Sequence, residues 1–239
     1  MFAFHGYGQT RTVFSELTRC FPEYTIYAFD LFFHGESNWE ESDTIMSPAF
    51  IQEFIAGFAL RNNIQRFSLL GFSIGARVVL AAIPLFSSMI DHVWLLAPHG
   101  VKSDYLYKFA TRSGIGTRLF RGMLSQSGWL FRLFDLMARS GIADRKLLRF
   151  AKSRLRTEAG RKRVYNTWML YSALDKPWKE VVAVLNASGI RLIVVLGASD
   201  FLFKPDYFES RLKDVINKEI MTLESSHERL IYDMIETLS

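Results

Sequence analysis

The sequence contains a single cysteine, Cys20, among its 239 residues. No intramolecular disulfide can form from one thiol, and such low cysteine usage is typical of proteins in a reducing compartment. The N-terminal stretch lacks a basic segment followed by an apolar run, so we expect no signal peptide. No run of about 18 consecutive apolar residues occurs, so no membrane-spanning helix is expected. These absences predict a cytoplasmic protein without a transmembrane segment.

Internal repeats and low-complexity stretches are also missing. So is an interleaved aromatic and basic recognition motif, which argues against nucleic-acid binding even though the net charge is +5. We expect no cofactor and no bound metal. What is present is an ordinary globular composition, with 49% hydrophobic and 22% charged residues. The length fits one domain with room for an inserted subdomain.

Charge is unevenly distributed along the chain. Residues 101–180 contain 18 Lys and Arg against 6 Asp and Glu, whereas the remainder contains 11 against 18. A basic segment therefore lies within an acidic chain. One interpretation is an anionic substrate, such as a carboxylate, a phosphate or a carrier thioester. Attraction to an anionic membrane surface or to an acidic partner is a second, and a solvated helix face is a third.

Strand-like and helix-like segments alternate at both ends of the chain, which is typical of a mostly parallel sheet covered by helices on both faces. Ser47 as an N-cap and Pro48 in the first turn mark the start of one helix. Six strands are expected, at residues 1–4, 24–29, 67–70, 91–97, 191–196 and 216–223. Helices are expected at residues 12–20, 48–59, 74–85, 181–185, 207–212 and 228–238. The sequence therefore predicts an α/β fold with a six-stranded sheet.

Between residues 101 and 178 the alternation stops. No convincing strand pattern occurs there, and the amphipathic patterns predict helices instead. Examples of these patterns are residues 119–123, 129–137 and 164–174. Four glycines are expected to separate the helices: Gly114, Gly116, Gly128 and Gly141.

The stretch Gly71-Phe72-Ser73-Ile74-Gly75 matches the pattern G-x-S-x-G. An apolar run precedes it and a helix-like run follows it, which is the strand, tight turn and helix of a nucleophile elbow. The glycines leave room for the strand and the helix to approach each other, so that Ser73 stands clear of the sheet. The start of the following helix adds positive potential and a backbone N–H. The alternative is a glycine-rich turn around a structural serine.

A serine hydroxyl needs a base to accept its proton, and the base needs an orienting acid. His227 follows the last expected strand and is the best candidate for the base. Asp200 follows the strand before it and is the best candidate for the acid. Because functional residues gather at the carboxyl ends of parallel strands, we expect both side chains to lie near Ser73. The residues expected at this end of the sheet are His5, Asp30, Ser73, Pro98, Asp200 and His227.

An acyl-transfer intermediate also needs hydrogen-bond donors for its oxyanion. The backbone N–H of Ile74, directly after the serine, should be one. The other should be the backbone N–H of Tyr7, in the turn at residues 5–8, with His5 as a structural residue of that turn. Phe72, His34 and His99 are candidates for substrate contact, whereas His92 lies inside a strand.

These motifs resemble those of the α/β-hydrolase superfamily, in particular its small capped esterases, thioesterases and lyase-like members. The resemblance implies a core formed by residues 1–100 and 179–239, with residues 101–178 inserted as a helical cap, or lid. Two departures are visible. The chain begins almost at the oxyanion turn, so the usual leading antiparallel strands are missing and one sheet edge should be exposed. Ser226 also stands before the histidine, where glycine is common. The resemblance rests on His5 to Gly8, on Asp30 with His34 to Ser37, on Gly71 to Gly75, on Gly197 to Asp200 and on His227.

With serine at the elbow, the resemblance implies hydrolysis of a small carboxylic ester or thioester through an acyl-enzyme. The substrate would be a small acyl compound, and the basic segment leaves an anionic one open. A C–C bond hydrolase or a lyase using the same three residues on an anionic substrate is an alternative. A non-catalytic binding protein of the same fold is another. The oligomeric state is left open.

Overall fold

A computed structural model describes residues 1–40, 45–101, 105–125, 127–141 and 145–239. The chain divides into two compact units. The core unit contains Met1–Ser103 and Ala173–Ser239, and the helical unit contains Asp104–Ser172. No helix among the described residues is both long enough and apolar enough to cross a membrane.

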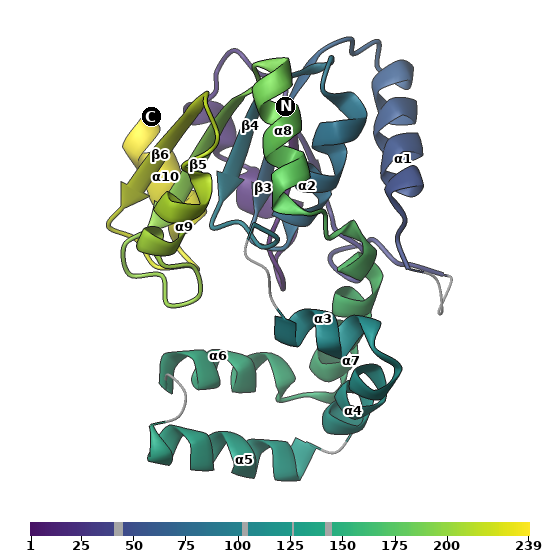
Figure 1. The fold of residues 1–239 in the computed structure, drawn as a ribbon, viewed down its shortest axis with the longest axis vertical. Coiled ribbons are helices and arrows are strands. Elements are labelled where there is room, and N and C mark those ends of the chain that lie inside the picture. Colours follow the sequence, from purple (N-terminus) through teal and green to yellow (C-terminus); the bar gives the residue numbers. More distant parts are fainter. Residues whose placement is uncertain (41–44, 102–104, 126, 142–144) are drawn as a thin grey trace. The chain divides into compact units, whose positions relative to one another are not determined.

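The core unit contains a six-stranded sheet in the order β2-β1-β3-β4-β5-β6 (Figure 1). Every neighbouring pair of strands is parallel, which confirms the predicted sheet. Its strands are β1 Phe2–Phe4, β2 Tyr27–Phe29, β3 Phe67–Phe72, β4 Ile90–Leu96, β5 Arg191–Gly197 and β6 Lys218–Leu223. β3 is buried along its whole length, as expected for a strand covered on both faces.

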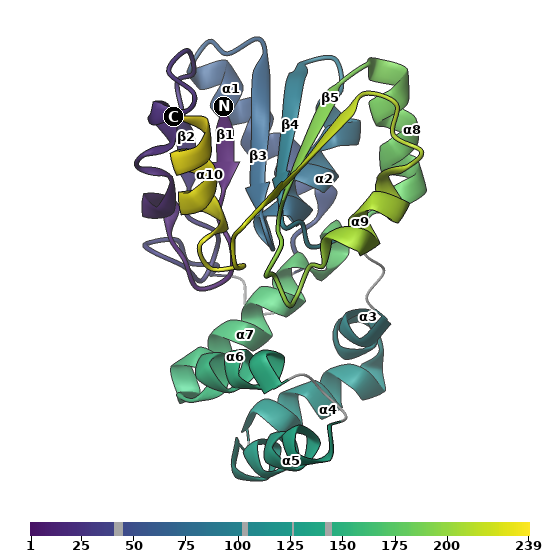
Figure 2. The same ribbon diagram turned by 90° about the vertical axis from the view of Figure 1, so that its left-hand side faces the viewer.

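Helices cover both faces of this sheet. Figure 1 shows α1, α2 and α8 in a row along one face, and α2 contacts both of the others. On the opposite face, α10 packs with two short 3₁₀ turns, and Figure 2 shows α10 in front of the sheet with α2 behind it. The helices of the core unit are α1 Pro48–Arg61, α2 Gly75–Phe86, α8 Trp178–Ser188, α9 Pro205–Leu212 and α10 Leu230–Leu238.

The start of α1 confirms the signal in the sequence. Ser47 has extended backbone angles, and its hydroxyl oxygen accepts a hydrogen bond from the Phe50 amide at 3.1 Å. Pro48 occupies the first helical position, where its missing N–H costs nothing. Local residues therefore provide an acceptor for the Phe50 amide and remove the need for one at Pro48.

Two predicted elements differ from the structure. The helix expected at residues 12–20 is a pair of 3₁₀ turns, η1 Arg11–Phe14 and η2 Leu17–Arg19. The spacing of three to four residues that buries Phe14 and Leu17 is available to short 3₁₀ turns as well as to an α-helix. The strand expected at residues 24–29 begins only at Tyr27, because the amide of Tyr24 closes a turn onto the carbonyl of Phe21 at 3.1 Å.

The helical unit contains no strand within its described residues. Gly116 lies inside α4 rather than between two helices. Helix α3 packs closely against α4 at this point, so a Cβ on Gly116 would overlap the carbonyl oxygen of Phe109. Gly114 is the first residue of α4 and Gly128 is the second residue of α5, so both lie at the start of a helix, as expected of glycines that punctuate the helices. Gly141, with a φ of 71°, follows the end of a helix as predicted. The helices of the unit are α3 Tyr105–Arg112, α4 Gly114–Ser125, α5 Ser127–Ser140, α6 Arg145–Leu155 and α7 Glu158–Leu170.

The helical unit is a few residues shorter at each end than the segment 101–178 expected as a cap. One residue of the core unit, Arg211, contacts both flanking segments. Its carbonyl accepts a hydrogen bond from the Trp178 indole at 2.9 Å, and its guanidinium donates to the Val101 carbonyl at 3.4 Å. Val101 and Trp178 therefore pack with the core, and the role of the helical unit as a cap stays a prediction.

Candidate active site

Ser73 occupies the tight turn between β3 and α2 with a φ of 51°. This left-handed conformation costs a non-glycine residue about 1–3 kcal/mol and persists only where the surroundings enforce it. Two backbone hydrogen bonds do so here. The Ser73 amide donates to the Leu96 carbonyl at 2.9 Å, and the His99 amide donates to the Ser73 carbonyl at 3.1 Å. The serine is thus attached on both sides to β4 and to the turn that follows it.

The two glycines of the motif are required by close approach. A Cβ on Gly71 would lie 2.7 Å from the Cα of Ala76, at the start of α2. A Cβ on Gly75 would overlap the carbonyl oxygens of Phe4 and His5, at the end of β1. Any larger residue would therefore push the helix away from the sheet, and the geometry of the predicted elbow accounts for the spacing of the motif.

Asp200 and His227 are brought together from the loops after β5 and β6. The His227 Nδ1–H donates to the Asp200 Oδ2 at 2.7 Å, and both side chains are buried. The other carboxylate oxygen, Oδ1, accepts the amides of Leu202 and Phe203 at 2.7 Å and 3.0 Å. Because Nδ1 carries the proton, the Nε2 of His227 is a proton acceptor. Ser226 in place of glycine does not keep His227 from reaching the acid.

The imidazole of His227 lies against two aromatic rings. The Phe72 ring is 5.0 Å away between centroids, and the Phe203 ring is stacked at 5.3 Å. Phe72 itself is buried, and a Cβ on Gly6 would lie 2.7 Å from its ring. This packing gives the Phe72 side chain a supporting position beside His227, and its contact with a substrate stays a prediction. Phe203 was not identified from the sequence, where only its place three residues after Asp200 could have pointed to it.

The turn at residues 5–8 follows β1. His5 is buried, donates from Nδ1 to the Gly6 carbonyl at 2.8 Å, and accepts the Leu31 amide on Nε2 at 2.9 Å. Burial lowers its pKa, so a neutral ring holds the turn in place. The Gly6 amide donates to the Gln9 side chain at 3.0 Å, which fixes the backbone beside Tyr7. Ile74 is the N-cap of α2, at the helix end where amides lack an intrahelical acceptor.

His34 supports this turn. It is buried, its Nδ1–H donates to the Phe32 carbonyl at 3.0 Å, and its ring meets those of His5 and Tyr7 edge-on at 5.3 Å and 5.4 Å. The contact of His34 with a substrate stays a prediction. His34 packs beneath the turn that presents Tyr7.

Asp30 follows β2 and fixes the next loop. It accepts the Arg11 amide at 2.6 Å and pairs with the Arg11 guanidinium. Burial alone would raise the pKa of Asp30, but hydrogen bonds from the Arg11 and Glu36 amides and the charge of Arg11 lower it. A Cβ on Gly35, whose φ is 54°, would overlap this carboxylate. Asp30 therefore serves the structure of the loop.

A buried arginine beside the elbow was missed by the sequence analysis. Arg77 lies on α2, four positions after Ser73, and its Nε–H donates to the Nδ1 of His99 at 2.7 Å. Its Nη1 lies 3.9 Å from the carboxylate of Asp175. The available signal was that Arg77 is the only charged residue in the apolar helix Gly75–Phe86.

This contact decides where the proton of His99 is. Arginine only donates, so the Nδ1 of His99 must accept and the proton must sit on Nε2. Burial, followed by the charge of Arg77 and that of His227, holds the pKa of His99 well below its ordinary value. His99 is therefore a neutral imidazole with an Nε2–H donor, joined through its own amide to Ser73.

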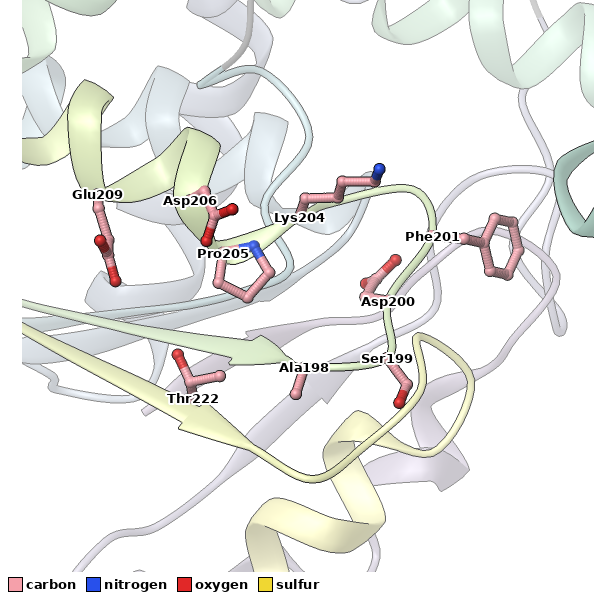
Figure 3. Close-up of a pocket in the computed structure, with 9 residues that line it drawn as sticks. All are labelled: Ala198, Ser199, Asp200, Phe201, Lys204, Pro205, Asp206, Glu209 and Thr222. Atoms are coloured by element: carbon pink, nitrogen blue, oxygen red, sulfur yellow. The ribbon is translucent and has the colours of Figure 1, made fainter. Parts of the chain in front are cut away.

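A pocket of about 630 Å³ opens beside Asp200, on the side of the loop that leads into α9 (Figure 3). Its wall is polar and carries charges of both signs, from Lys204, Asp206 and Glu209. Ser73 and His227 do not line it, so it is not the place where an acyl group would meet the serine. It is lined by Ala198, Ser199, Asp200, Phe201, Lys204, Pro205, Asp206, Glu209 and Thr222. Across the described residues, no group of three His, Cys, Asp or Glu side chains is placed to hold a metal ion.

Comparison with known proteins agrees with this architecture. A family model described as the alpha/beta hydrolase fold matches residues 1–227, and the chain belongs to that family. A search of curated protein sequences gives no match.

Solved structures share the fold at low sequence identity. A thermophilic esterase from Thermogutta terrifontis is 14% identical with a TM-score of 0.68, and the match covers 99% of this chain and 85% of that one. A thioesterase domain from the curacin biosynthetic pathway is 14% identical with a TM-score of 0.62, covering 99% and 89%. A carboxylesterase from Nitrososphaera gargenis is 17% identical with a TM-score of 0.62, covering 99% and 87%.

Proposed function

We propose that the protein is a serine hydrolase that cleaves a small carboxylic ester or thioester through an acyl-enzyme. The observation that carries the proposal is the 2.7 Å hydrogen bond between buried Asp200 and His227, in the core unit that also holds Ser73 on a strained elbow. Ser73 is the nucleophile, His227 the general base and acid, and Asp200 the orienting acid.

The proposed reaction has two halves. Ser73 Oγ attacks the acyl carbonyl while His227 Nε2 takes its proton, and the imidazolium that forms is stabilised by Asp200. His227 then gives that proton to the departing alcohol or thiol, which leaves the acyl group on Ser73. In the second half His227 takes a proton from water, the hydroxide adds to the acyl carbon, and Ser73 Oγ recovers its proton as the acid departs.

The oxyanion formed in each half is proposed to bind the amides of Ile74 and Tyr7. Ile74 supports this role because it begins α2, where the helix dipole adds positive potential. Tyr7 supports it because the surrounding turn is anchored through His5 and Gln9. Removing one donor of this kind typically lowers kcat by about 10²–10³.

His99 is proposed to present its Nε2–H toward the substrate. It is tied to the Ser73 carbonyl through its amide and to Arg77 through its ring. A neutral donor at this point orients a polar group of the substrate without adding a second positive charge beside His227.

The ester or thioester class is supported by two considerations. The nucleophile is Ser73, and the structures of similar fold include enzymes named as esterase, thioesterase and carboxylesterase. An ancestral haloalkane dehalogenase also shares the fold at 13% identity, with a TM-score of 0.62. Aspartate at the elbow would indicate that chemistry, and this chain has serine there.

The test is hydrolysis of p-nitrophenyl esters from acetate to laurate by wild type, by Ser73→Ala and by Ser88→Ala. Ser88 lies just beyond the far end of α2 and is the matched control. We expect turnover in wild type and in Ser88→Ala, with an optimum of chain length, and loss in Ser73→Ala. A fluorophosphonate probe should label wild type and the control only.

Two outcomes separate the alternatives. Labelling of Ser73 without turnover of any ester or thioester would replace the proposal with C–C bond hydrolysis or lyase chemistry on the same residues. Failure of both labelling and turnover would leave a binding protein of this fold.

A further inference from the structure

Helix α5 of the helical unit exposes a line of large apolar side chains. Trp129, Leu133 and Leu136 are each between 37% and 62% exposed. Their spacing of four and then three residues places them on one side of the helix. Leu130 is turned away from this line by about a quarter of a helical turn, and it is almost fully buried. We call Trp129, Leu133 and Leu136 the α5 stripe.

Two arginines border the α5 stripe. Arg132 and Arg139 are exposed, and each lies three positions after a member of the stripe, so both face the same side of α5. Helix α4 repeats the pattern, with Ile115 and Leu119 exposed by 70% and 55% and with Arg118 exposed between them. Large apolar side chains and guanidinium groups are therefore exposed together on two neighbouring helices.

The whole helical unit is strongly basic. Residues 104–172 contain 15 Lys and Arg against 4 Asp and Glu, a net charge of +11. Four carboxylates can neutralise at most four of these cations, so an excess of positive charge remains whatever pairs they form. Exposed apolar side chains beside uncompensated positive charge mark a surface for an anionic partner with an apolar interior.

We propose that the helical unit docks on an anionic lipid surface through the α5 stripe. Trp129 would lie at headgroup level, where the indole ring is favoured, with Leu133 and Leu136 at the acyl boundary. Arg132 and Arg139 would reach the phosphates while their methylene stems cover apolar surface.

A lipid surface fits better than an acidic protein because of shape. One face of a single helix is convex, and a protein partner would need a complementary groove to bury it. A bilayer interface deforms around such a face and supplies anionic groups on both sides of it. The inference does not depend on the proposed hydrolysis, which concerns residues of the core unit.

The test is co-sedimentation of the full chain with phosphatidylcholine vesicles, with and without phosphatidylglycerol. The stripe variant is Trp129→Ser/Leu133→Ser/Leu136→Ser, and the arginine variant is Arg132→Gln/Arg139→Gln. The matched control is Leu60→Ser/Ile216→Ser, which removes two apolar side chains of the core unit that are 81% and 80% exposed.

We expect wild type and control to bind the anionic vesicles at least about tenfold more tightly than the neutral ones, and less tightly as salt is raised. Both α5 variants should lose most of this binding. The Trp129→Phe variant should lose a blue shift of tryptophan fluorescence that wild type shows with vesicles. Unchanged circular dichroism and an unchanged Tm of the stripe variant would show that it is folded.

Other results would overturn the proposal. One is equal binding by the stripe variant and wild type, and another is no binding of wild type to either kind of vesicle. A third is binding of soluble polyglutamate with no loss in the stripe variant, which would indicate an acidic protein partner. A stripe that only joins two copies of the chain would appear as a concentration-dependent dimer in sedimentation velocity, lost in the stripe variant, without vesicle binding.

Discussion

The carboxylate of Asp200 accepts three hydrogen bonds, of which one comes from His227 Nδ1 and two from backbone amides. The carboxylate cannot rotate without breaking the two hydrogen bonds from the backbone amides, so the imidazole is held in one orientation. The tautomer of His227 is thereby set by backbone geometry as well as by charge.

We expect Asp200→Asn to fold normally and to lose most activity. The amide has nearly the same shape, but it can offer an N–H to Nδ1 and so favour the tautomer in which Nε2 already carries a proton. A change of this kind lowers kcat by about 10⁴ in serine hydrolases with the same arrangement. The measurement is kcat on a p-nitrophenyl ester, with the Tm as the control for folding. Activity within tenfold of wild type would contradict the assignment of Asp200.

The low pKa of His99 makes stability depend on pH. Burial, then Arg77, then His227 keep the folded state from binding a proton at this ring. The unfolded chain binds one below its ordinary pKa of about 6.5, so the free energy of unfolding should fall as pH falls through that value. The expected slope from this residue is up to about 1.4 kcal/mol per pH unit.

Urea unfolding of wild type and His99→Gln at about pH 7.5 and about pH 5.5 measures this effect. The variant should lose less stability on acidification. The pKa of His5 is also lowered by burial, but His5 is present in both proteins and its contribution cancels. An equal loss in both proteins would show that His99 takes up its proton in the folded state as well.

Gly75, at the start of α2, and Gly122, inside α4, should respond in opposite ways to substitution by alanine. Gly75→Ala places a Cβ on the carbonyl oxygens at the end of β1, so we expect a loss of more than about 2 kcal/mol and a displaced elbow. Gly122→Ala in α4 meets no atom within 4 Å and should gain about 0.5–1 kcal/mol. Chemical denaturation of both variants gives the comparison, and activity should fall only in Gly75→Ala. An unchanged free energy of unfolding in Gly75→Ala would mean that α2 can shift without cost.

The stacking of Phe203 on His227 should be needed for rate more than for folding. Phe203→Ala removes the ring that lies 5.3 Å from the imidazole, which leaves His227 freer to turn about its bond to Asp200. We expect kcat to fall on the order of tenfold to a hundredfold, with KM changed less. Phe203→Tyr keeps the ring and should retain activity. Equal losses in both variants would point to a tight fit at the ring edge in place of stacking.

The sequence predicts best what a strand or a helix positions through its backbone. Ser73, Asp200 and His227 each follow a strand with a clear apolar pattern, so their place at the carboxyl edge could be predicted. The link between Arg77 and His99 could not, because it joins side chains from separate segments and leaves no spacing in the chain. The burial of Phe72 and His34 was missed for the same reason, since their neighbours come from other loops.

Errors in element type have a different origin. Val13, Leu17 and Cys20 recur at a spacing shared by α-helices and by successive 3₁₀ turns, so the pattern alone cannot separate the two. Of the four glycines expected to separate helices, only Gly116 lies inside one. In the helical unit, close packing of α3 on α4 favours a residue without a side chain at Gly116, and that preference does not appear in the local sequence.

The contacts of Arg211 have a consequence for modularity. Val101 and Trp178 belong to the core unit and flank the helical unit in the sequence, and Arg211 makes a hydrogen bond to each of them. Both hydrogen bonds lie wholly within the core unit. A shortened chain in which a few flexible residues replace the helical unit keeps both hydrogen bonds of Arg211. The helical unit could therefore be replaced by another insertion without redesign of the sheet.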